Sequence, residues 1–171
     1  MPRATVRAAI TTYLQSAAQT VPGLSVLGAV FAHPPKWTDE QNFFATSWSG
    51  QNAGAAIFVY LEEQSEERIR VIGAALGGKQ RTYKVKLLCF FRAVGKAEDA
   101  DAGNDSFLDA LVLAIQENRQ PGGSSVVFQW GEGDTVGGVD INVSAGMPRP
   151  INARLLQVYS TVEVLAIEMD A

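Results

Sequence analysis

The sequence predicts an α+β fold: a predominantly antiparallel sheet with two amphipathic helices packed on it and a long loop that contains aromatic residues. The first observation is that apolar and polar residues alternate over residues 81–92 with the period of a β-strand. The second is a helical spacing of apolar residues in two segments, one at the start of the chain and one beyond its middle. The third is that short connections link successive strand candidates, which favours antiparallel neighbours.

Length and composition fit one α+β domain that spans residues 1–171. Hydrophobic residues make up 47% of the chain and charged residues 19%, which is enough for a core without disulfides or a structural metal. The net charge of −4 argues against a protein that grips nucleic acid by neutralising phosphates, although DNA can pass nearby. No stretch reaches the roughly 20 apolar residues that a membrane helix needs, so we expect a soluble protein with no membrane partner.

The chain is predicted to open with an amphipathic helix that starts near Pro2 and is stopped by Pro22 and Gly23. Its apolar residues recur with helical spacing and form one stripe: Val6, Ala9, Ile10, Tyr13, Leu14 and Ala17. Residues 24–32 are apolar and β-branched enough for a strand, which ends where two prolines follow His33.

A long loop is predicted over residues 33–54, because no steady period of either kind is present there. Loops of this length are uncommon in compact domains unless they bind something or move. Four aromatic residues in this loop favour contact with another surface: Trp37, Phe43, Phe44 and Trp48.

Residues 55–61 and 68–74 are predicted to be two strands of a hairpin whose tip is the acidic segment 62–67. After a glycine pair, residues 81–92 add a third strand, so that the three form a meander. The acidic residues of such a tip are solvated, and burial does not tune them for acid–base chemistry: Glu62, Glu63, Glu66 and Glu67.

The strand at residues 81–92 has two unlike faces. One face is apolar throughout, with Tyr83, Val85, Leu87, Cys89 and Phe91. The other face changes from charged to apolar along the strand, with Lys84, Lys86, Leu88, Phe90 and Arg92. A strand of this kind covers a second surface, and we expect a neighbouring subunit or a covering helix there rather than a substrate.

A loop is predicted over residues 94–103, followed by a helix that Asn104 or Asp105 caps. The apolar stripe of this helix consists of Phe107, Leu108, Leu111, Val112 and Ile115. A Pro-Gly-Gly sequence that starts at Pro121 ends it.

Three further strands complete the predicted sheet. Residues 126–130 form one strand, and the segment 139–143 beyond a glycine-rich turn is its expected partner. The last strand, residues 154–168, is apolar on both faces toward its end, so we expect it to lie centrally.

Two motifs suggest ligands but lack their structural context. Residues 73–79 have the glycine and lysine spacing of a phosphate-binding loop, which needs Ser or Thr next and a helix that begins there. Gln80 follows instead and Arg81 opens a strand, so nucleotide binding is disfavoured. A calcium site is disfavoured too, since the EF-hand spacing is absent from the acidic residues of the glycine-rich turn: Glu132, Asp134 and Asp140.

The sequence gives no signature of an enzyme. His33 is the only histidine and Cys89 the only cysteine, so neither a histidine metal pair nor a Ser-His-Asp set is indicated. Cys89 falls in the apolar alternation of its strand, where we expect it to be buried. The tryptophans are expected to pack in the core or against a subunit, because the basic groove of a base-stacking platform is missing: Trp37, Trp48 and Trp130. We expect no catalytic residue, no metal and no cofactor.

The order of elements resembles the tail terminator or tail completion proteins of long-tailed, siphophage-type bacteriophages. The matching pieces are the first helix from Val6 to Leu14, the glycine pair that leads into the strand at Arg81, the helix over residues 108–115 and the closing strand over residues 158–167. Together they extend over most of the chain.

The resemblance implies a structural virion protein that assembles in the host cytoplasm and caps the tail tube as a ring, typically a hexamer. It implies contacts with the tail tube protein and with the head–tail connector, while DNA passes through without specific binding. The expected subunit, tube or connector contacts are Leu88, Phe90, Trp37, Phe43, Phe44 and Trp48. Acidic residues are expected to face the DNA channel so that the genome slides: Glu62, Glu63, Glu66, Glu67, Asp99 and Asp101.

Two other functions compete with this one. Another neck protein, such as a head completion or head-to-tail joining protein, also needs a ring. A small-molecule or carbohydrate binding module would use the tryptophans of the loop over residues 33–54. An enzyme with dispersed catalytic residues is the least favoured possibility.

Overall fold

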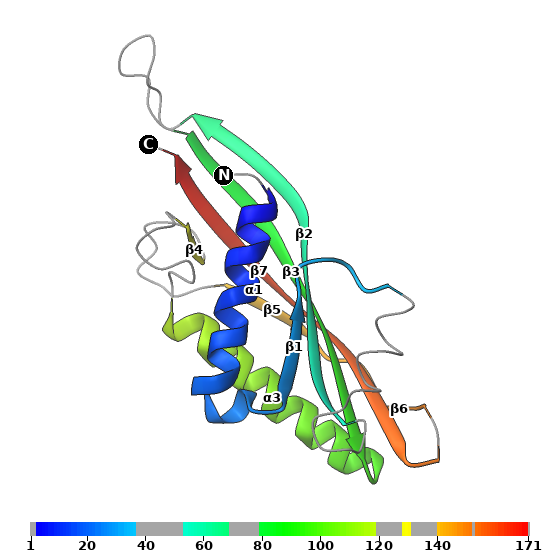
Figure 1. Ribbon diagram of the computed structural model, residues 1–171. Coiled ribbons are helices and arrows are strands. Elements are labelled where there is room, and N and C mark those ends of the chain that lie inside the picture. The colour runs from blue at the N-terminus through cyan, green and yellow to red at the C-terminus, as the bar shows by residue number, and fades with distance from the viewer. Residues whose placement is uncertain are drawn as a thin grey trace.

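The structure is a computed structural model, and it describes residues 3–36, 53–68, 79–118, 128–130, 140–151 and 153–170. Within these residues the predicted α+β fold is confirmed, since a mostly antiparallel seven-stranded sheet is combined with two α-helices (Figure 1). The elements are α1 (Arg3–Thr20), the 3-10 helix η1 (Pro22–Leu24), β1 (Leu27–Phe31), β2 (Gly54–Arg68), β3 (Lys79–Val94), α3 (Ala97–Glu117), β4 (Phe128–Trp130), β5 (Ile141–Ser144), β6 (Arg149–Pro150) and β7 (Leu155–Asp170).

The sheet is built around β3 and β7, two long antiparallel strands that pair along their whole lengths. The strand order is β1, β2, β3, β7 and β4, and β5 and β6 pair with the same edge of β7 as β4. The prediction that the last strand lies centrally is therefore confirmed. The predicted pairing of residues 126–130 with residues 139–143 is wrong, because β7 is long enough to pair with β4, β5 and β6 in succession.

One hydrophobic core lies between the sheet and the two helices, which cover the same face. α1 buries Val6, Ile10, Leu14 and Ala17 over β1 and β2, and α3 buries Phe107, Leu108, Leu111 and Ile115 over β3 and β7. The helices also meet each other, since the Tyr13 hydroxyl donates to the Ala114 carbonyl at 2.5 Å. Gly23 allows η1 to approach α3 closely, because a Cβ atom there would collide with Ala110. Both predicted apolar stripes thus face the core.

The acidic segment over residues 62–67 is the second half of β2, so the prediction that it forms a hairpin tip is wrong. Its side chains lie across from basic residues of β3, and Glu66 pairs with Lys79 at 2.6 Å and with Arg81 at 2.9 Å. Opposite charges across an antiparallel pair stabilise a strand even where its side chains are polar. Residues 69–78 lie outside the described residues, and with them most of the strand expected at 68–74.

α3 begins at Ala97, so the prediction of a loop over residues 94–103 with a cap at Asn104 or Asp105 is wrong. Lys96 is the N-cap residue, and its backbone N–H donates to the Asp99 carboxylate at 3.4 Å. Asp99 also adds negative charge to the first turn, where the helix dipole favours it. Asn104 lies inside the helix and is buried, and its amide donates to the Ser160 hydroxyl at 3.2 Å.

Most of the loop over residues 33–54 lies outside the described residues, as do the glycine-rich turn and all of the phosphate-loop motif except Lys79. Lys79 itself opens β3, so the motif is followed by a strand, as predicted, and not by a helix.

Candidate interaction surface

One face of the sheet is covered by α1 and α3. The other face contains the side of β3 that the sequence predicts to change from charged to apolar. Side chains of the helix-covered face belong to the main core, and they alternate along each strand with side chains that point the other way. The opposite side of β1, β2 and β3 holds a separate apolar cluster made of Ala56, Phe58, Phe31, Leu88 and Phe90. Neither helix packs on this cluster in the described part of the chain (Figure 1). We call this side the open face.

Four aromatic rings cross the open face, one from each of β1, β2, β3 and β7. Phe31 stacks on Phe58 with ring centroids 4.8 Å apart, and the Phe90 ring meets Phe58 edge-on at 5.6 Å. Tyr159 then follows Phe90 at 5.0 Å. Strand register produces this order, because Phe31 lies opposite Phe58 and Phe90 lies opposite Tyr159. We refer to these four residues as the aromatic row.

The aromatic row is packed at its centre and open at one end. Phe58 is only 3% exposed, and the rings of Phe31, His33 and Phe90 all lie against it. Tyr159 at the β7 end is 45% exposed. An apolar patch at a protein surface that is rimmed by polar residues is typical of a site where another protein binds. The aromatic row is therefore tightly packed around Phe58 and accessible to solvent at Tyr159.

Charged residues form that polar rim, farther along the same strands. The Lys84 ammonium lies 3.1 Å from Glu62, and Lys86 lies 3.2 Å from Glu163 and 3.9 Å from Glu62. The hydrogen bond from Lys84 lowers the pKa of Glu62 and raises the pKa of Lys84. A hollow of about 300 Å³ adjoins this charged cluster, lined by Lys84, Asp140, Ile141, Asn142, Glu163, Val164 and Leu165. The open face is thus apolar near one end of β3 and charge-paired toward the other.

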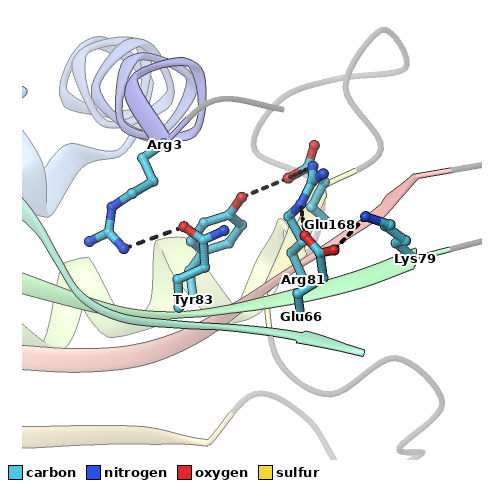
Figure 2. Close-up of polar contacts among 7 residues, drawn as sticks. Arg3, Glu66, Lys79, Arg81, Tyr83 and Glu168 are labelled. Atoms are coloured by element: carbon cyan, nitrogen blue, oxygen red, sulfur yellow. Dashed lines mark hydrogen bonds and ion pairs between the residues drawn. The ribbon is translucent and has the colours of Figure 1, made fainter. Parts of the chain in front are cut away.

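A second polar cluster lies on the helix-covered side of β2, β3 and β7, near the start of α1 (Figure 2). The Tyr83 hydroxyl donates to the buried Glu168 carboxylate at 2.8 Å, and the Arg81 guanidinium lies 3.6 Å from the same carboxylate. Burial, followed by the bond to Glu168, raises the pKa of Tyr83 to about 12. Arg3 of α1 donates to the side chain of Gln64 at 3.4 Å and to the Leu61 carbonyl. These contacts join α1 to β2 and β3 to β7, which is a structural role.

This second cluster yields a prediction about acid stability. Hydrogen bonds from Lys79 and Arg81 lower the pKa of Glu66 from its ordinary value of 4.5 to about 2. The folded state therefore binds this proton less readily than the unfolded state, so the pairing stabilises the fold above about pH 4.5 and is lost as the pH falls toward 2. The free energy of unfolding of wild type should exceed that of Glu66→Gln at pH 7, and the difference should shrink over this interval.

Urea unfolding at a series of pH values measures this difference, and Lys79→Met supplies the control. In that background Glu66 has lost its closest cation, so Glu66→Gln should change the pH dependence less. A difference between wild type and Glu66→Gln that is constant from pH 7 to pH 2 would contradict the assignment.

The structure places the expected contact residues as follows. Leu88 and Phe90 lie on the open face, and the fold joins them to Phe31, Phe58 and Tyr159, which sequence reasoning did not select. The alternation of Ala56, Phe58 and Tyr60 could have indicated a second apolar face on β2. The residues that pack against Phe58 and Phe90, however, come from strands far apart in sequence. The expected contacts of the long loop lie outside the described residues: Trp37, Phe43, Phe44 and Trp48.

The expected channel-facing carboxylates do not form one group. Glu62 and Glu66 are ion-paired with β3, whereas Glu63 and Glu67 are exposed on β2. Asp99 and Asp101 are exposed in the N-terminal part of α3, which follows the last residue of β3. The acidic half of β2, in contrast, pairs with the first residues of β3. The two sets therefore lie at opposite ends of β3 (Figure 1).

The residues that the sequence analysis weighed as reactive or ligand-binding groups pack against other side chains. Cys89 is fully buried, and burial raises the pKa of its thiol, as expected for a core residue. Trp130 is also buried, in line with the packing role expected for it. His33 rests on the rings of Phe31 and Phe58. Among the described residues no group of three or more His, Cys, Asp or Glu side chains is arranged to hold a metal ion.

No protein-family model matches the chain, and no curated protein matches it. Within the described residues, neither α1 nor α3 has an apolar stretch long enough to cross a lipid bilayer.

Proposed function

We propose that this protein is a structural subunit of a bacteriophage tail, a tail terminator that caps the tail tube as a ring and joins it to the head connector. The observation that carries the proposal is the aromatic row on the sheet face that α1 and α3 leave open. An assembly protein needs a rigid apolar surface for another subunit, and the packed Phe58 holds such a surface in place.

The charges of β3 fit a ring through which DNA passes without being held. Four basic side chains of this strand are engaged in ion pairs with carboxylates: Lys79, Arg81, Lys84 and Lys86. Such pairing leaves little positive charge for phosphates, and the chain as a whole carries −4. Glu63 and Glu67 are exposed, and we propose them as residues that face the channel.

A structural role accounts for the described residues better than binding or catalysis does. The single cysteine and Trp130 are enclosed in the core, so neither a reactive thiol nor a stacking platform is presented there. Two charged groups that line the hollow are already engaged in ion pairs with residues outside it, Lys84 with Glu62 and Glu163 with Lys86. The nearest alternative is another neck protein that also forms a ring, and the identity of the particle that it caps separates the two.

The proposal predicts that purified protein caps tail tubes, which electron microscopy of tubes mixed with the protein detects directly. Tyr159→Glu should weaken capping at least tenfold, because it puts a charge on the exposed end of the aromatic row. Aromatic residues central to an interface commonly contribute about 2 kcal/mol or more to binding. The fraction of capped tubes against protein concentration gives the size of the effect.

Leu113→Glu is the matched control, since Leu113 is a similarly exposed apolar residue but lies on α3, on the other side of the sheet. It should cap tubes like wild type. Equal capping by Tyr159→Glu and wild type would remove the aromatic row from the contact. Failure of wild-type protein to cap tubes, together with capping of empty heads, would favour a head completion protein instead.

A further inference from the structure

A groove runs along the outer edge of β1, on the side away from β2. Its volume is about 330 Å³, and it is lined by Gln15, Ala18 and Gln19 of α1 and by Leu27, Gly28, Ala29 and Val30 of β1. β1 is the terminal strand of the sheet and pairs with β2 alone among the described strands. Backbone N–H and C=O groups on the outer side of such a strand are available to a further strand.

The side chains of this groove suit an extended chain segment. Gly28 and Ala29 are small, so a second backbone can come close to β1. Gln15 and Gln19 are exposed, and their amide groups can both donate and accept hydrogen bonds, as a peptide backbone does. Addition of a strand to an open sheet edge beside a helix is a common way to bind a polypeptide.

The opposite edge of the sheet offers a segment that fits. β5 has four residues against the five of β1, and it pairs with β7 alone among the described strands. Val143 of β5 lies across from the core residue Val162 and so points to the helix-covered side, yet it is exposed. The chain that follows β5 stays on this edge, and Gly146 makes that possible because a Cβ atom there would collide with the Tyr159 carbonyl. Met147 and Ile151, also exposed, extend the apolar character of the edge.

Strand directions make the two edges compatible. β1 runs parallel to β2, and each step from β2 to β3, β7 and β5 reverses direction, so β5 runs opposite to β1. A rotation about an axis close to the strand direction keeps all strand directions and keeps the helices on the same side of the sheet. β5 of one copy would then meet β1 of the next in the antiparallel sense, with Val143 beside Ala18 and Leu27.

We propose that β5 of one copy binds in the groove between α1 and β1 of the next copy, so that the sheet continues from subunit to subunit. This edge contact rests on the ring proposed above and names its subunit interface, which lies at the two sheet edges and does not use the aromatic row. The two patches are different, so the contact is heterologous, and a heterologous contact forms a ring when the rotation from one copy to the next closes.

Two single substitutions test this contact from its two sides. Val143→Lys places a charge on the edge strand that would be donated, and Gly28→Lys fills the groove that would accept it. Gly28 does not need a left-handed backbone, since the positive φ angles among the described glycines belong to Gly54 and Gly95. Each variant alone should remain monomeric in native mass spectrometry under conditions in which wild type forms rings, with tail tube protein added if wild type requires it.

Mixing the two variants is the decisive measurement. Val143→Lys keeps an intact groove and Gly28→Lys keeps an intact β5, so an equimolar mixture should form one-to-one dimers and nothing larger. Circular dichroism and urea unfolding show whether each variant folds, and Leu113→Lys on the outer side of α3 is the control that should form rings. If Val143→Lys fails to fold, Asn142→Lys in the same exposed strand replaces it.

The outcomes separate this contact from the proposed function. Rings formed by both variants as readily as by wild type would overturn the edge contact while tube capping still stands. Monomers at every concentration of wild type, with or without tube protein, would overturn it as well. Dimers in the mixture together with wild-type rings that never cap tubes would support the edge contact and count against the tail terminator.

Discussion

Replacing Phe58 by alanine is expected to lower the free energy of unfolding by about 3–5 kcal/mol, the range for truncating a buried phenylalanine. The side chain is 3% exposed and touches the rings of Phe31, His33 and Phe90, so its removal leaves a cavity that three neighbours border. Urea unfolding followed by circular dichroism measures the change. This loss would be unusual for a residue on the face of a sheet that its own helices do not cover.

Tyr60→Ala is the matched control for this prediction. Tyr60 lies two residues along β2 on the same face and is 37% exposed, so its truncation should cost far less. Similar losses for Phe58→Ala and Tyr60→Ala would mean that the aromatic row is not packed as a unit. A normal stability of Tyr159→Glu, measured alongside, would show that the exposed end of the row can be changed without unfolding the protein.

Local periodicity was sufficient to predict the central part of the fold. The alternation in β3 identified both its buried face and the second face that turns apolar at Leu88 and Phe90. The helical stripe of α1 is buried as expected, and the apolar run at the end of the chain forms the central strand β7. Each of these segments has a strong period of its own, which neighbouring strands and helices reinforce.

The features that the sequence analysis missed depend on partners that are distant along the chain. The run of glutamates in β2 has no apolar alternation. Its strand structure depends on β3, where Arg81 lies across from Glu66 and Lys79 also forms an ion pair with it. The aromatic row depends in the same way on the register of four strands, which no single segment specifies. α3 begins earlier than predicted because its N-cap residue is Lys96, and lysine is not a residue type typical of that position.

Replacing Arg81 by methionine is expected to destabilise the protein by about 3 kcal/mol, the low end of the range for removing one partner of a buried charge. The Glu168 side chain is 2% exposed and keeps the hydrogen bond from Tyr83, but it loses a guanidinium 3.6 Å away (Figure 2). Urea unfolding at pH 7 measures the loss. Glu66→Gln removes only the more exposed partner of Arg81 and should have a much smaller effect.

The double variant Arg81→Met with Glu168→Gln separates the two contributions of Arg81. Glutamine at residue 168 is neutral and can still accept the hydrogen bond from Tyr83, so the double variant should be more stable than Arg81→Met alone. That rescue would show that the cost comes from a buried charge rather than from lost packing of the arginine stem. If adding Glu168→Gln lowers stability further, Arg81 and Glu168 act independently, and the cluster that joins β2, β3 and β7 depends on hydrogen bonds rather than on charge compensation.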